Sequence, residues 1–112
     1  MSLHLFCHST LAKADIEEAL RRLSAQRTDL FSKKFLIFDV KEAVDIDKKI
    51  GLGFGFHSKF FFVIRVNDKS EAHRIREAAG LLRRTFGPQN VLVLFENETE
   101  VGPEDRSADS GT

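Results

Sequence analysis

The sequence predicts an α+β domain, with a four-stranded antiparallel sheet and two helices packed on one face of it. Four short segments are apolar and rich in β-branched or aromatic residues, which is typical of strands. Two longer segments carry apolar residues at helical spacing. With 112 residues, 42% of them hydrophobic and 30% charged, the chain suits one globular domain.

The first half of the chain supplies a strand, a helix and a second strand. Residues 3–8 alternate in polarity and predict the first strand. Asp15 predicts a helix N-cap, and the helix is expected to run to about Arg27. Its buried face combines four apolar residues, Ile16, Ala19, Leu20 and Leu23. Residues 34–40 predict the second strand.

The second half supplies a third strand, a second helix and a fourth strand, after a connection whose secondary structure the sequence leaves open. Residues 41–50 fit either a strand extension or a short helix, and residues 51–57 alternate glycine with apolar side chains. Residues 59–66 predict the third strand and 91–95 the fourth. The helix between them uses Ala72, Ile75, Ala78, Ala79 and Leu82. The resulting order, β-α-β-β-α-β, is that of the ferredoxin-like motif.

Both faces of the third strand are apolar. Phe60, Phe62, Ile64 and Val66 point to one side of the sheet, and Phe61 and Val63 to the other. Two helices cover only one of these faces. We therefore expect the open face to be covered by a partner, most simply by a second copy of the chain in a homodimer.

Composition narrows the class of protein. Seventeen basic and seventeen acidic residues cancel, so no net field steers the chain to nucleic acid or to a membrane. No signal peptide or membrane-length apolar run is recognised, and Cys7 is the single cysteine. We expect a cytoplasmic protein without a cofactor or a bound metal, in which Cys7 is buried and the four histidines lie at the surface or at strand edges. Residues 1–98 are expected to form the domain, and 99–112 a disordered acidic tail.

One motif suggests nucleic-acid binding. Gly53-Phe54-Gly55-Phe56, taken with Leu5-Phe6 on the first strand, resembles the RNA-recognition motif family, in which strand aromatics stack on bases. The resemblance implies single-stranded nucleic acid on exposed Phe side chains. Leu52 and His57 stand where that family has a basic and an apolar residue.

A second pattern suggests metal chemistry. Asp29, followed ten residues later by Asp39-Val40-Lys41, resembles the metal-dependent nucleases of the restriction type. The resemblance implies that two carboxylates hold Mg²⁺ while Lys41 polarises the attacking water. A charged pair at a strand end is also typical of a solvated terminus.

We favour a third interpretation, a non-enzymatic regulatory protein that acts by binding another protein, as an inhibitor, immunity protein or adaptor does. The eleven Phe residues exceed what one small core needs, and loops commonly carry function. The expected binding residues are Phe54, Phe56, His57, Phe61 and Phe6. Nucleic-acid binding is the first alternative and a nuclease using Asp29, Asp39 and Lys41 is the second.

Overall fold

The sheet is antiparallel throughout and has six strands among the residues that the computed structural model describes, 3–31, 34–67 and 73–101. Its order is β2-β4-β1-β5-β6, and the short β3 also pairs with β4. The strands are β1 (Leu3–Ser9), β2 (Phe35–Ile37), β3 (Lys41–Glu42), β4 (Phe60–Val66), β5 (Val91–Phe95) and β6 (Thr99–Glu100). The helices are α1 (Lys13–Gln26), α2 (Thr28–Phe31), α3 (Asp45–Leu52) and α4 (Ile75–Phe86).

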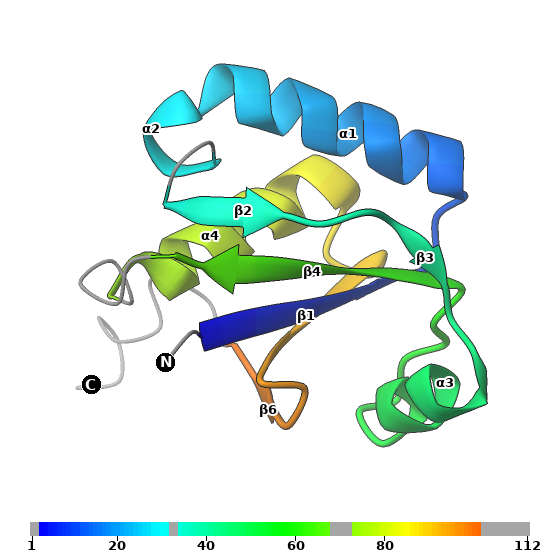
Figure 1. Cartoon of the computed structure of the whole chain (residues 1–112). Helices are drawn as coiled ribbons and strands as arrows, with labels where there is room; N and C mark the ends of the chain where they lie inside the picture. The colour runs from blue at the N-terminus through cyan, green and yellow to red at the C-terminus, as the bar shows by residue number, and fades with distance from the viewer. Residues whose placement is uncertain (1–2, 32–33, 68–72, 102–112) are drawn as a thin grey trace.

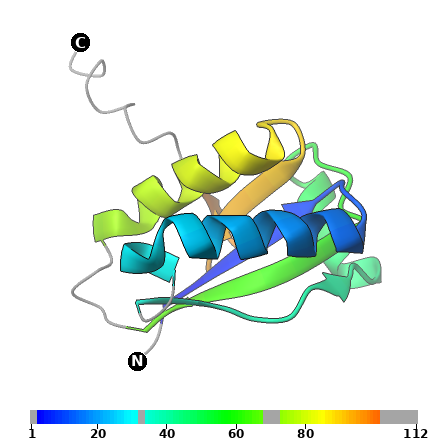
Figure 2. The ribbon, with the colours of Figure 1, turned by 90° about the horizontal axis from the view of Figure 1, so that it is seen from above.

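Helices α1 and α4 lie side by side over one face of the sheet, as Figures 1 and 2 show. The core between these layers contains the predicted helical face of α1, and Leu5, Phe62 and Ile64 from the strands are fully buried there. From α4 it takes Ala78, Ala79 and Leu82, as expected, whereas Ala72 falls outside the described residues. Helix α3 lies at one end of the sheet, on the side away from α1 (Figure 1).

The strand count differs from the predicted four for two reasons. Residues 41–52 form both structures that the sequence left open, because Lys41 and Glu42 pair with β4 and the chain then turns into α3. The second reason is the turn at Glu96 and Asn97, which adopt φ of 54° and 61° and reverse the chain into β6. The α+β class and the antiparallel sheet are confirmed.

The predicted tail begins too early. Thr99 and Glu100 pair with β5, and the next residue, Val101, is 7% exposed within the core. The N–H group of Val101 donates to the carbonyl of Val93 at 3.0 Å, and its own carbonyl accepts from Arg83. A single apolar side chain in a polar segment has no periodicity, so the sequence did not reveal this contact. Residues 102–112 of the predicted tail lie outside the described part of the chain.

The sheet face opposite α1 and α4 is partly covered by the chain itself. Leu92 and Leu94 of β5 are 5% and 0% exposed although neither belongs to the helix-side core. Phe6, Phe61 and Val63 are half-buried on the same face. The two-sided apolar pattern is therefore real, but the area left for a partner on this face is smaller than predicted.

Candidate functional site

Exposed large apolar side chains gather in one segment of the described structure. Val44, Ile46, Leu52 and Phe54 are 59, 65, 52 and 40% exposed, and Phe38 is 46% exposed just before β3. The first four belong to α3 or to the residues beside it, and we call these four the α3 surface. Scattered apolar residues are ordinary on a protein, but four on a helix of eight residues and its flanks make this segment the candidate binding surface.

Local sequence explains why a helix forms here. The Asp47 carboxylate accepts the N–H of Val44 at 3.0 Å, which satisfies a donor at the helix start. Asp45 and Asp47 lie in the first turn and Lys49 in the last, which matches the helix dipole. Gly55, at φ 73°, helps to reverse the chain after the helix.

Gly51 fixes the distance between α3 and the sheet. It is buried, and a Cβ atom at this position would lie 2.3 Å from Ser58 Oγ and 3.0 Å from the carbonyl oxygen of Phe56. Only glycine allows this approach without movement of its neighbours. The inner side of α3 is thus held against the start of β4, which leaves Ile46 and Leu52 facing outward.

Ser58 continues this anchor into the sheet through a buried histidine. Its Oγ lies 2.9 Å from Nδ1 of His8, and Nε2 of His8 lies 3.1 Å from Oδ1 of Asn97. His8 is fully buried, so the expectation of four surface or edge histidines was wrong for this one. The chain Ser58–His8–Asn97 joins the end of the α3 segment to β1 and to the turn before β6. These hydrogen bonds fix Ser58, and with it the residues that follow α3, against the sheet.

A pocket of about 340 Å³ opens beside the α3 surface. It is lined by Thr10, Lys48, Leu52, His57, Ser58 and Lys59, so Leu52 belongs to both features. No carboxylate lines it. Within the described residues, neither Lys48 nor Lys59 forms an ion pair, and both are exposed. The arrangement combines an apolar wall with two free ammonium groups.

Comparison with known proteins identifies the family. Residues 1–99 match the family model of the CDI system immunity component. The chain belongs to this family. It is 31% identical over 98 residues to immunity protein CdiI-2 of Burkholderia pseudomallei strain 1026b, which covers 88% of this chain and 97% of that protein. A solved CdiA-CT/CdiI toxin and immunity complex from Burkholderia pseudomallei matches with a TM-score of 0.85 at 29% identity, over 89% of this chain and 97% of that chain.

The predicted site residues of this CDI immunity component fall into two groups. One group follows α3 and consists of Phe54, Phe56 and His57. Phe54 is 40% exposed, Phe56 is half-buried, and His57 lines the 340 Å³ pocket beside α3. Phe61 and Phe6 lie on the sheet face opposite α1, where Phe61 packs 6.3 Å from the ring of His8. The structure therefore brings three of the five together, and the binding role of all five stays a prediction.

The most exposed residues of the α3 surface, Val44 and Ile46, were missed. In the sequence they alternate with charged residues, which gives no clear amphipathic face. The sequence does contain a signal: two β-branched apolar residues lie in a charged segment that has no amphipathic face to bury them.

The resemblance to RNA-recognition motifs does not extend to the position of the aromatic motif in the fold. Gly53-Phe54-Gly55-Phe56 forms a turn after α3, whereas that family carries its aromatics on a strand. The prediction assigned the motif by glycine–aromatic alternation, which turns and strands share. Phe6 and Phe61 remain half-buried on strands, but no row of exposed aromatics faces solvent among the described residues of the sheet.

The nuclease pattern also separates in space. Asp29 receives Arg27 at 3.0 Å and Arg74 at 3.0 Å, and both arginines also bind Glu77. The hydrogen bonds from Arg27 and then Arg74 hold the pKa of Asp29 far below its usual range. Its carboxylate is thus part of a ring of four ion-paired residues, Arg27, Asp29, Arg74 and Glu77, which links α2 to α4. In the described residues no group of three or more His, Cys, Asp or Glu side chains is arranged to hold a metal ion.

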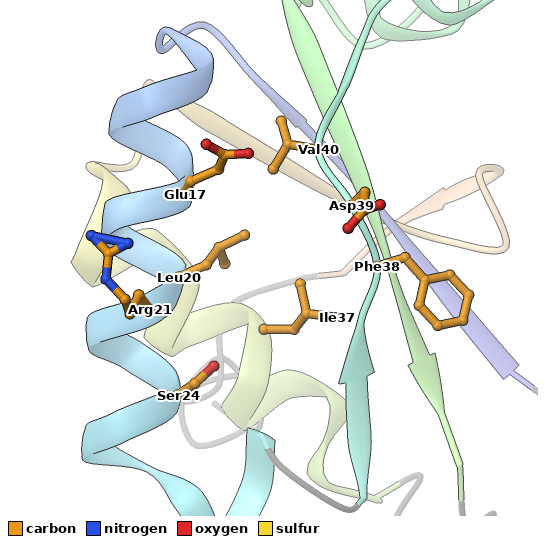
Figure 3. A pocket seen from close by; sticks show the side chains of 8 residues that line it. All are labelled: Glu17, Leu20, Arg21, Ser24, Ile37, Phe38, Asp39 and Val40. Carbon is orange, nitrogen blue, oxygen red and sulfur yellow. The ribbon is translucent and has the colours of Figure 1, made fainter.

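Asp39 instead lines a second cavity, of about 220 Å³, between α1 and the chain after β2 (Figure 3). Leu20, Ile37 and Val40 form its apolar part, with Glu17 and Asp39 at its edges, while the Phe38 ring points away from it. Lys41 is exposed on β3. The charged residues that line this cavity, Glu17, Arg21 and Asp39, have both signs. The pocket beside α3 differs, because its lining includes two lysines and no carboxylate.

Two further findings concern residues outside these sites. Burial raises the pKa of the Cys7 thiol above its usual range, and Cys7 lies in the core as expected. No helix in the described part of the chain is both long and apolar enough to cross a membrane.

Proposed function

We propose that this chain is an immunity protein of a CDI system and that it acts by binding a toxin domain. The match of residues 1–99 to the immunity family supports this function, as does the fold shared with a chain of a toxin and immunity complex. The observation that carries the mode of action is the exposed apolar α3 surface. An inhibitor needs a rigid, preformed surface, and α3 is anchored by Gly51 and Ser58.

The α3 surface is the proposed contact for the toxin. Ile46 and Leu52 are large, outward-facing and held on a helix, so their burial in a complex removes apolar area from water without ordering a loop. Phe54 adds an aromatic side chain beside them. Aromatic and aliphatic residues at the centre of an interface commonly carry most of the binding energy.

The test uses the toxin domain encoded by the same CDI system. We expect the purified toxin and this chain to form a stable complex, and co-expression of the chain to restore growth of cells that produce the toxin. Ile46→Asp and Leu52→Asp should each weaken the complex at least about tenfold, because each places a charge in a desolvated contact. Ala14→Asp, on the exposed side of α1, is the matched control. Absence of both binding and protection by the wild-type chain would overturn the proposed function.

Three finer proposals accompany this one. The ferredoxin-like assignment is supported by the order β2-β4-β1-β5 of the four longer strands. Self-association through Phe6, Phe61 and Val63 is tested by sedimentation at high protein concentration, where a dimer is expected and a monomer contradicts it. A cytoplasmic location is tested by fractionation of cells that express the chain.

A further inference from the structure

We propose that the pocket beside α3 receives a carboxylate side chain, Asp or Glu, from the toxin. The proposal rests on the toxin-binding function above and adds the chemistry of one contact. It concerns the pocket lined by Thr10, Lys48, Leu52, His57, Ser58 and Lys59.

The charge of the pocket is the first argument. Its charged lining consists of Lys48 and Lys59, with no acidic residue among the lining side chains. Elsewhere in the described structure, basic side chains such as Arg27 and Arg74 are matched by carboxylates from this chain. Two lysines that converge on one cavity without an internal partner repel each other, and an incoming anion relieves that repulsion.

The polar groups of the pocket support the same guest. The Thr10 hydroxyl donates its hydrogen to Oδ1 of Asn90 at 2.9 Å, and Ser58 Oγ is engaged with His8. Neither hydroxyl therefore has its hydrogen free for a ligand. The remaining free donors are the ammonium groups and the imidazole of His57, which suit an acceptor-only group such as a carboxylate.

Position identifies a protein as the source of that carboxylate. Leu52 is a wall of the pocket and also a member of the α3 surface, so a side chain that enters the pocket lies beside the proposed apolar contact. An acidic residue at the border of an apolar patch is the complementary partner for such a surface. The cavity is about 340 Å³, large enough for one acidic side chain and water.

Charge reversal tests the proposal by titration calorimetry with the purified toxin domain. Lys48→Glu and Lys59→Glu should each raise Kd at least about tenfold, because an attractive ion pair is replaced by two like charges. Added salt should weaken binding of these variants less than binding of the wild type, because salt screens their repulsion. The matched control is Lys13→Glu, which makes the same change of charge at an exposed position of α1, outside both the pocket and the α3 surface. It should leave Kd within about twofold, within the range of surface substitutions. A toxin variant in which the partner acid becomes Lys should restore binding to Lys48→Glu.

The outcomes separate this proposal from the proposed function. If Leu52→Asp abolishes binding while Lys48→Glu and Lys59→Glu do not, the α3 surface is correct and the carboxylate proposal is wrong. If Lys13→Glu weakens binding as much as the pocket variants, a general charge effect replaces the specific contact. If single-stranded RNA binds the wild-type chain and loses affinity in Lys48→Glu, the pocket takes phosphate and the proposal is also overturned.

Discussion

Ser58 Oγ lies 2.9 Å from Nδ1 of the fully buried His8. Oδ1 of Asn97 accepts from Nε2 of the same ring, so Nδ1 carries the lone pair and Ser58 donates to it. Ser58 also lies against Gly51 at the end of α3. One hydroxyl thus satisfies a buried ring nitrogen and sets the closest approach of the helix that carries the proposed binding surface.

Removal of this hydroxyl is expected to destabilise the protein. Ser58→Ala leaves Nδ1 of His8 buried without a partner, which costs about 1–3 kcal/mol in the free energy of unfolding. Urea denaturation measures the loss. A change in the midpoint too small to detect would show that the hydrogen bond contributes no net stability.

The contact between Gly51 and Ser58 predicts a coupling between two substitutions. Gly51→Ala alone places a methyl group 2.3 Å from Ser58 Oγ and forces α3 away from the sheet. In the double variant with Ser58→Ala the nearest obstructing atom is gone. The combined loss of stability should therefore be smaller than the sum of the two single losses. Additive losses would contradict the close approach of this pair.

The end of the domain is tested at Val101. Its side chain is 7% exposed, and its backbone pairs with Val93. Val101→Ala removes two buried methyl groups and should lower the unfolding free energy by about 1.5 kcal/mol. Truncation after Glu98 should lower it further, because β6 is lost as well. Thermal unfolding of both variants measures this, and an unchanged melting temperature after truncation would restore the original assignment of 99–112 as a tail.

The ion-pair ring predicts a dependence of stability on pH. Hydrogen bonds from Arg74 and Arg27 lower the pKa of Glu77 to about 2 from an ordinary value of 4.5, so the unfolded chain binds more protons between these values. The contribution of Glu77 is fully present above about pH 4.5 and is lost as the pH falls toward about 2. Urea denaturation across this range should show wild type more stable than Glu77→Gln at pH 6, with a gap that closes near pH 2.

The control for this pH series is Glu17→Gln, which removes a carboxylate outside the ring. Over the same range the gap between wild type and Glu77→Gln should close by more than the gap between wild type and Glu17→Gln, because only Glu77 belongs to the ring. A constant gap between wild type and Glu77→Gln would show that the ring contributes no proton-linked stability.

Prediction from sequence succeeded where one physical signal dominated. The faces of α1 and of β4 followed from apolar periodicity alone, and Phe62 and Ile64 lie in the core as their spacing required. The α+β class followed from the same signal. The protein-binding class, too, came from an excess of Phe and a glycine-rich connection rather than from any catalytic motif.

Prediction failed where a structure depends on contacts between distant residues. The burial of His8 requires Ser58 and Asn97, which lie 50 and 89 residues away in the chain. The burial of Val101 requires Val93 and Arg83. Neither contact has a local pattern, so the strand count, the tail boundary and the anchor of α3 were found only in the structure.

Hydrogen–deuterium exchange of this chain with and without the purified toxin domain tests the central claim most directly. If the α3 surface binds the toxin, amide exchange should slow in residues 41–59, with little change in α1 and α4. Exchange that slows only in α1 and α4, while residues 41–59 are unaffected, would contradict the proposed surface and place the toxin on the helical face of the molecule.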